Sequence, residues 1–181
     1  MIMYEEWHQP GTKTLVNGYV IPAGQTGLKD INDAVHQLFL HPNVGPFIGK
    51  QLIQRLVTSN PTPGYISRVA AVFADNGQGE RGDMGAVIKA ILMDPEARTC
   101  SALEEDRFGK LREPFTRYTH FSKAIQMEQY YGRYWNVAYG FYQATNQMPL
   151  ASRTVFNFFL PDFQPIGAIA DNGLVGPEFQ I

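Results

Sequence analysis

Chemistry in this chain would have to come from a few scattered side chains. The four histidines, His8, His36, His41 and His120, show no i, i+4 spacing of the kind that lets two imidazoles face one zinc ion. His8 and His120 could still meet through the fold, beside a carboxylate, as a composite site. We therefore take His8, His120 and Arg153 as the candidate catalytic residues.

A glycine-rich segment, DNGQGERGD at residues 75–83, carries the candidate metal ligands Asp75, Glu80 and Asp83. A calcium-binding loop between two helices needs glycine at its sixth position and glutamate at its twelfth. Counted from Asp75, these positions hold Glu80 and Ala86. We therefore favour a structural turn in which Asp83 caps the following helix, with Arg81 paired locally.

Further charged residues allow two interpretations. The acids Asp94, Glu96, Glu113 and Glu178 could supply a pair of carboxylates for glycosidic chemistry, but helix junctions explain them better. Four arginines have apolar neighbours in the sequence: Arg55, Arg68, Arg112 and Arg153. We interpret them as interhelical ion pairs, with an anion clamp for a sulfated or carboxylated substrate as the alternative.

The sequence lacks the usual signatures of nucleophilic and nucleotide chemistry. Cys100, the only cysteine, has no histidine near it in sequence to act as its base. No serine stands in a Gly-x-Ser-x-Gly elbow, and no glycine-rich run matches a phosphate-binding loop. We expect no bound cofactor.

Composition narrows the class of partner. Of the 181 residues, 44% are apolar, 18% are charged and 13% are aromatic, with a formal net charge of −2. Without a block of Lys and Arg there is no footprint for nucleic acid, and no apolar run approaches the length of a membrane span. An aromatic cluster at Tyr130–Tyr142 suggests burial against a protein surface.

The elements that must position these residues are mostly helical. Asn17-Gly18 between KTLV and YVI predicts a small hairpin or an extended arm. Apolar periodicity predicts helices over 28–40, 44–58, from Pro63 to 73, over 84–93 and from Glu113-Pro114 onward, followed by an irregular C-terminal segment. We expect one mainly α domain over 1–181, an irregular multi-helix bundle.

The apolar positions of the first four helices should face one another. The expected inward sets are Leu28, Ile31, Val35, Leu38 and Phe39; Phe47, Ile48, Leu52, Leu56 and Val57; Ile66, Val69, Val72 and Phe73; and Met84, Val87, Ile88, Ile91 and Leu92. Such stripes on consecutive helices are hidden when the helices stack side by side.

The chain resembles the bacterial family called domain of unknown function 1800. The resemblance rests on PAGQT at 22–26, HPNVGPFIGKQLIQRLVTSNP at 41–61, FADNGQGERGDMGAVIKAILMDPEAR at 73–98, REP at 112–114, SRTVFNFFLPDF at 152–163 and LVGPEFQI at 174–181, together with KTL at 13–15. The family pattern has Asp after the early His, whereas Gln9 follows His8 here.

The resemblance implies more than the residues themselves do. Family members are longer, so it implies that this chain is a C-terminal portion, and it is the sole indication of an extracytoplasmic location. We expect an interaction or structural module that binds either a protein partner or a missing N-terminal portion of the same protein. The alternative is a fragment of an enzyme acting on an extracellular polymer, such as a sulfated polysaccharide.

Overall fold

The computed structural model describes residues 3–99, 108–110, 112–128, 130–132, 137–152, 159–160 and 162–174. The predicted mainly α fold is confirmed, since within these ranges the strands form only one two-stranded hairpin. In chain order the elements are η1 (Glu5–Trp7), β1 (Lys13–Thr14), β2 (Val20–Ile21), α1 (Gly27–Leu40), α2 (Val44–Leu56), α3 (Pro63–Ala74), α4 (Met84–Met93), α5 (Pro95–Arg98), α6 (Pro114–Ala124), α7 (Val137–Thr145) and α8 (Ala168–Asp171).

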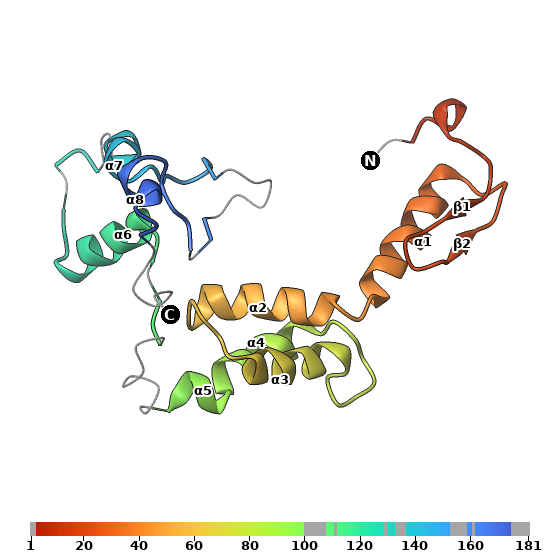
Figure 1. Cartoon of the computed structure of the whole chain (residues 1–181), viewed down its shortest axis with the longest axis horizontal. Helices are drawn as coiled ribbons and strands as arrows, with labels where there is room; N and C mark the ends of the chain where they lie inside the picture. Colours follow the sequence, from red (N-terminus) through yellow and green to blue (C-terminus); the bar gives the residue numbers. More distant parts are fainter. Residues whose placement is uncertain are drawn as a thin grey trace.

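The elements form an extended arrangement (Figure 1). The hairpin and α1 lie at one end, α2 to α5 occupy the middle, and α6 to α8 lie at the other end. The helical core sits in the middle part, where α2, α3 and α4 contact one another. The first and last parts therefore flank the core rather than cover it.

The hairpin forms where the sequence predicts it. The strands pair in antiparallel register, with Lys13 opposite Ile21 and Thr14 opposite Val20. At the turn the N–H of Gly18 donates to the carbonyl of Leu15, and Gly18 adopts a φ of 78°. This is the arrangement of a three-residue loop, in which the position after a type I turn needs positive φ and so favours glycine.

Helix ends follow local chemistry. Asp83 accepts from the N–H of Ala86 and caps α4, and Thr62 accepts from the N–H of Tyr65 and caps α3, where Pro63 occupies the first turn. Helix α1 ends at Leu40, immediately before His41-Pro42, as predicted. Short polar side chains and prolines thus set the helix boundaries.

The core of the middle part joins three helices. Its buried members are Ile53 from α2, Tyr65, Val69 and Phe73 from α3, and Val87 and Ile91 from α4. The apolar side chains packed around them include Val44, Ile48, Leu52, Val57, Ile66 and Val72. The prediction that α2, α3 and α4 stack on their apolar faces is confirmed.

The inward face of α2 differs from the expected one. Gly45, Gly49 and Ile53 are its buried residues, whereas Phe47 and Leu56 are about half exposed. A Cβ at Gly49 would lie 3.1 Å from Val69 Cγ1, and one at Gly45 would lie 3.3 Å from the carbonyl oxygen of Ala70. The glycines let α2 approach α3 closely, so the predicted Ile48, Leu52 and Val57 border the core, whereas Phe47 and Leu56 were predicted wrongly.

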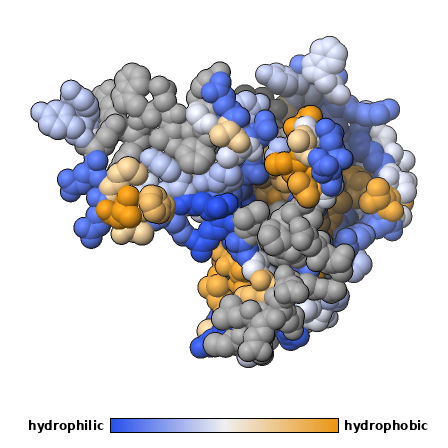
Figure 2. All heavy atoms as spheres, turned by 60° about the vertical axis from the view of Figure 1, so that its left-hand side comes forward, coloured by the Kyte–Doolittle hydropathy of each residue, from blue (hydrophilic) through white to orange (hydrophobic). Residues whose placement is uncertain are grey.

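The apolar stripe of α1 also departs from expectation. Leu28, Val35 and Leu38 keep 50%, 58% and 56% of their surface exposed. Only Phe39 at the end of the stripe reaches the core, where its ring packs against Phe73 at 5.9 Å. On α4, Met84, Ile88 and Leu92 are likewise at least 40% exposed. Figure 2 shows such hydrophobic side chains at the surface in several separate groups.

Tyr65 supplies a polar contact inside the core. Its hydroxyl donates to the carbonyl of Ile91 at 2.6 Å, and burial, with smaller contributions from Asp94 and Glu96, raises its pKa to about 12. An unfolded tyrosine ionises near pH 10, so stability should fall as pH rises from about 10 to 12. We expect Tyr65→Phe to lower the free energy of unfolding by about 1 kcal/mol at neutral pH. The variant should also lose less of its unfolding free energy than the unaltered chain as pH rises from about 10 to 12, measured by urea titration. An equal loss in the two proteins would contradict the burial of the hydroxyl.

Candidate functional site

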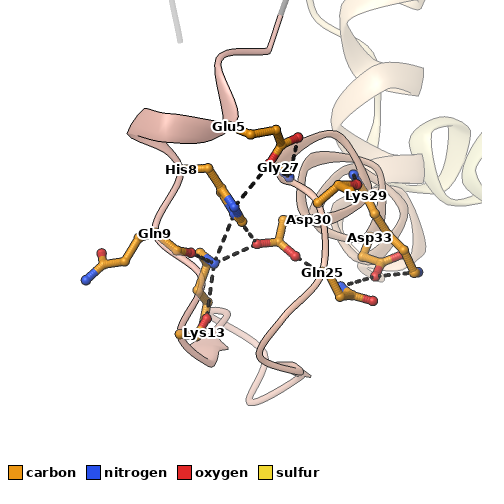
Figure 3. A network of polar contacts seen from close by, with 11 residues as sticks. Glu5, His8, Gln9, Lys13, Gln25, Gly27, Lys29, Asp30 and Asp33 are labelled. Carbon is orange, nitrogen blue, oxygen red and sulfur yellow. Dashed lines mark hydrogen bonds and ion pairs between the residues drawn. The ribbon is translucent and has the colours of Figure 1, made fainter.

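A buried carboxylate at the start of α1 organises the N-terminal segment (Figure 3). Asp30 contacts Nε2 of His8 at 2.8 Å and Nζ of Lys13 at 2.6 Å. The side-chain amide of Gln25 donates to Asp30 at 3.0 Å, and the Glu5 carboxylate accepts from the N–H of Gly27 at 3.1 Å. The segment before the hairpin is therefore held against the first turn of α1.

This network forms one wall of a hollow of about 620 Å³. The side chains of His8 and Asp30 are 11% and 8% exposed, so both are nearly buried there. The rest of the lining is mainly apolar and includes Met3, Tyr4, Trp7, Leu15, Ile21, Ile31 and Ala34. An imidazole and a carboxylate thus meet beside an apolar cavity of a size common for small ligands.

The electrostatics of the network favour a structural role. The Lys13 ammonium holds the pKa of Asp30 well below its usual range, with hydrogen bonds from Gln25 and His8 acting in the same direction. The second ring nitrogen of His8, Nδ1, lies 3.6 Å from the Glu5 carboxylate. Because both ring nitrogens face carboxylates, neither is directed at a reacting group. Within the part of the chain that the structure describes, the residues that line this hollow include no serine, threonine or cysteine.

The structure does not bring His8 and His120 together. His120 lies on α6, at the opposite end of the fold from the hairpin and α1 (Figure 1), and its ring contacts the Arg112 guanidinium. Arg153 lies outside the described residues. The acid that meets His8 is Asp30, 22 residues further along the chain. The sequence analysis did not place Asp30 at a site, because no spacing rule connects it with His8 or Lys13.

The candidate metal ligands Asp75 and Asp83 accept hydrogen bonds from residues of their own loop. Asp75 Oδ1 accepts from the N–H groups of Gly77 and Gly79 at 2.8 and 2.9 Å, and Asp83 accepts from Asn76 at 2.8 Å. These contacts hold the pKa values of both aspartates below the usual range. Across the part of the chain that the structure describes, no three His, Cys, Asp or Glu side chains are grouped as a metal site. Arg81 bonds to the carbonyls of Phe39 and His41 rather than to a carboxylate of its own loop.

The arginines separate into two places. Arg68 makes two hydrogen bonds of 2.7 Å to Asp94, the residue that we had expected beside Arg98. Arg55 and Arg112, by contrast, line a single hollow of about 360 Å³. Arg55 bonds to Glu113 at 3.0 Å, which agrees with the predicted interhelical ion pair.

Two more cations line that hollow, Lys110 and Arg117, which sequence reasoning missed. Lys110 precedes α6 and Arg117 lies in its first turn, while Arg55 lies near the end of α2. The available signal was the run of basic residues at 107, 110, 112 and 117, which lacks the regular spacing of a motif.

Of the helices described, none is long and apolar enough to cross a bilayer.

Comparison with known proteins identifies the family. No curated protein and no solved structure matches the chain significantly. A family model described as "Protein of unknown function (DUF1800)" matches residues 1–180, nearly the whole chain. This match agrees with the resemblance carried by the motifs at 41–61 and 73–98. The chain therefore belongs to the family called domain of unknown function 1800.

Proposed function

We propose that this chain is an interaction module, and that α1 and the hairpin bind an apolar helical face of a protein. The observation that carries the proposal is the exposed stripe of α1, formed by Leu28, Val35 and Leu38, each at least half exposed. Helices α2 to α4, by contrast, bury Ile53, Val69 and Val87 against one another. A contiguous apolar surface that a protein leaves uncovered is typical of an interaction site.

The shape of this surface suits a helix. Helix α1 is 14 residues long and carries its exposed apolar side chains at helical spacing, which provides ridges for a second helix to pack against. Beside the stripe lies a hollow of about 240 Å³ between the hairpin and α1, with Leu15, Val16 and Leu38 among its lining residues. Side chains of a partner helix could enter this hollow while its backbone follows α1.

Docking would add part of the energy needed for association. Full burial of one valine or leucine side chain is worth about 1.5–3 kcal/mol, and the three residues of the stripe are already about half buried, so each contributes about half of that and offsets part of the entropy lost on association. The partner surface can belong to another part of the same polypeptide or to a separate protein. The family resemblance is what supports an extracytoplasmic location for this interaction.

Site-specific photo-crosslinking tests the proposal in the native host. A photoreactive residue at position 35 should form adducts with an apolar helical segment, identified by mass spectrometry. The same residue at position 36, where His36 lies on the polar side of α1, is the matched control. An intramolecular adduct assigns the surface to the same polypeptide, and an intermolecular adduct assigns it to a separate protein. Equal yields from positions 35 and 36 would contradict the proposal.

A second candidate function is part of an enzyme acting on an extracellular polymer. One observation favours it: the His8–Asp30 pair lies at a hollow bordered by Tyr4 and Trp7, and aromatic faces of this kind stack on sugar rings. It ranks second because both ring nitrogens of His8 face carboxylates. In an enzyme, His8→Gln would abolish turnover while the fold is retained, whereas a structural His8 would only loosen the N-terminal segment.

A further inference from the structure

The hollow lined by Arg55 and Arg112 is unusually cationic. It lies between the end of α2, the start of α6 and the segment around Phe159 and Phe163, and its volume is about 360 Å³. Four basic side chains line it, and Glu113 is the only acidic residue among the described residues of its lining. A hollow of this size falls within the range of small-ligand sites. Its excess of positive charge selects for an anion.

Internal contacts satisfy only part of this charge. Arg55 is held by the Glu113 carboxylate and by the carbonyl of Phe159. Among the described residues, the side chains of Lys110 and Arg117 form no hydrogen bond or ion pair. Burial lowers the pKa of Lys110, and the positive charges of Arg55 and Arg112 lower it further. An anion placed between these cations would relieve their repulsion.

The start of α6 adds hydrogen-bond donors to the same place. Glu113 occupies the N-cap position and makes no side-chain cap hydrogen bond, so the N–H groups of the first turn have no cap from that residue. Such N–H groups and the helix dipole favour bound oxyanions.

We propose that this hollow binds a sulfate or phosphate group. Lys110 and Arg117 contact the oxyanion, and Arg55 is held in place by Glu113 and contributes positive charge. The site lies at the other end of the fold from α1 (Figure 1), so the proposal does not depend on the docking surface. It gives the anion clamp, considered from sequence for four arginines, a specific location and two further cations.

Calorimetric titration of the whole chain with inorganic sulfate and inorganic phosphate tests the proposal. We expect both anions to bind, and to bind more tightly than chloride at equal ionic strength. Lys110→Gln and Arg117→Gln should each weaken binding about tenfold, equivalent to about 1.4 kcal/mol. Lys110→Arg, which keeps the charge, should retain binding, and Lys123→Gln at the far end of α6 is the matched control. Binding should also weaken as pH rises past the pKa of Lys110.

Two outcomes would overturn the inference. One is binding of sulfate and phosphate no tighter than that of chloride, and the other is an equal loss in Lys123→Gln and Lys110→Gln. If Lys110→Gln fails to fold, Arg117→Gln provides the same test, because Arg117 is exposed. Glucose 6-sulfate then separates the two sources of the group: tighter binding than inorganic sulfate assigns the hollow to an ester ligand, and weaker binding assigns it to the free anion.

Discussion

Replacement of Gly49 with leucine is expected to destabilise the chain by about 2 kcal/mol. A Cβ at this position already lies 3.1 Å from Val69 Cγ1, so the larger side chain must push α2 away from α3. Overpacking of this kind costs about 1–3 kcal/mol or more and outweighs the roughly 1 kcal/mol that leucine gains over glycine in helix propensity. Urea unfolding followed by circular dichroism measures the change.

Lys50→Leu is the matched control for this prediction. Lys50 is the next residue of α2 and is exposed, so the same new side chain should change stability by less than about 0.5 kcal/mol. A Gly49→Leu variant as stable as Lys50→Leu would show that α2 does not lie close to α3 along this face.

Removal of the Arg68 side chain is the second change with a large expected effect. Asp94 is 5% exposed, and Arg68 makes two hydrogen bonds of 2.7 Å to it. Arg68→Ala leaves this carboxylate nearly buried with the N–H of Glu96 as its remaining donor. Loss of one partner of a buried pair costs about 3–5 kcal/mol, and the half-exposed guanidinium reduces our expectation to about 2 kcal/mol.

The pH dependence gives an independent check of that pair. The Arg68 guanidinium, helped by the N–H of Glu96, lowers the pKa of Asp94 below its usual value of 3.8. The pair therefore stabilises the fold above about pH 4, and this contribution is lost as pH falls through the lowered pKa. Arg68→Ala should be less sensitive to acid than the unaltered chain. Arg98→Ala, which removes an arginine close to Asp94 in sequence that makes no ion pair with it, should leave both stability and acid sensitivity unchanged.

Local structure was predictable because its causes are local. Asn17-Gly18 marked the turn of the hairpin, Pro63 and Asp83 marked helix starts, and His41-Pro42 marked a helix end. Each of these residues acts on its own backbone or on that of its neighbours. The mainly α fold followed from the same signals.

Packing was less predictable because it depends on distant partners. Phe47 and Leu56 are as apolar as Ile53, yet α3 meets the side of α2 that carries Gly45 and Gly49. Apolar periodicity counts only the side chains that are present, so it does not show where glycine allows two helices to pack closely. The prediction that the apolar stripe of α1 is buried was wrong for the opposite reason. Its periodicity is regular, but it is Phe39 at its end that packs against Phe73 of the core.

At the candidate sites too, contacts between neighbouring residues were predictable and contacts between distant residues were not. Asp83 was recognised as a cap because three residues separate it from the N–H that it accepts. Asp30 and Lys13 were missed as partners of His8 because the hairpin and the start of α1 must fold together before they meet. Arg55 and Lys110 meet for the same reason, through elements 55 residues apart in the sequence.

The central claim is that the apolar face of α1 lies outside the core that α2, α3 and α4 form. Thiol labelling of Val35→Cys and Val69→Cys, each combined with Cys100→Ser, measures this directly, since the two valines are 58% and 0% exposed. We predict that the purified chain labels at position 35 at the rate of a free thiol, and at position 69 at least about 100-fold more slowly. Equal protection at the two positions would contradict the claim.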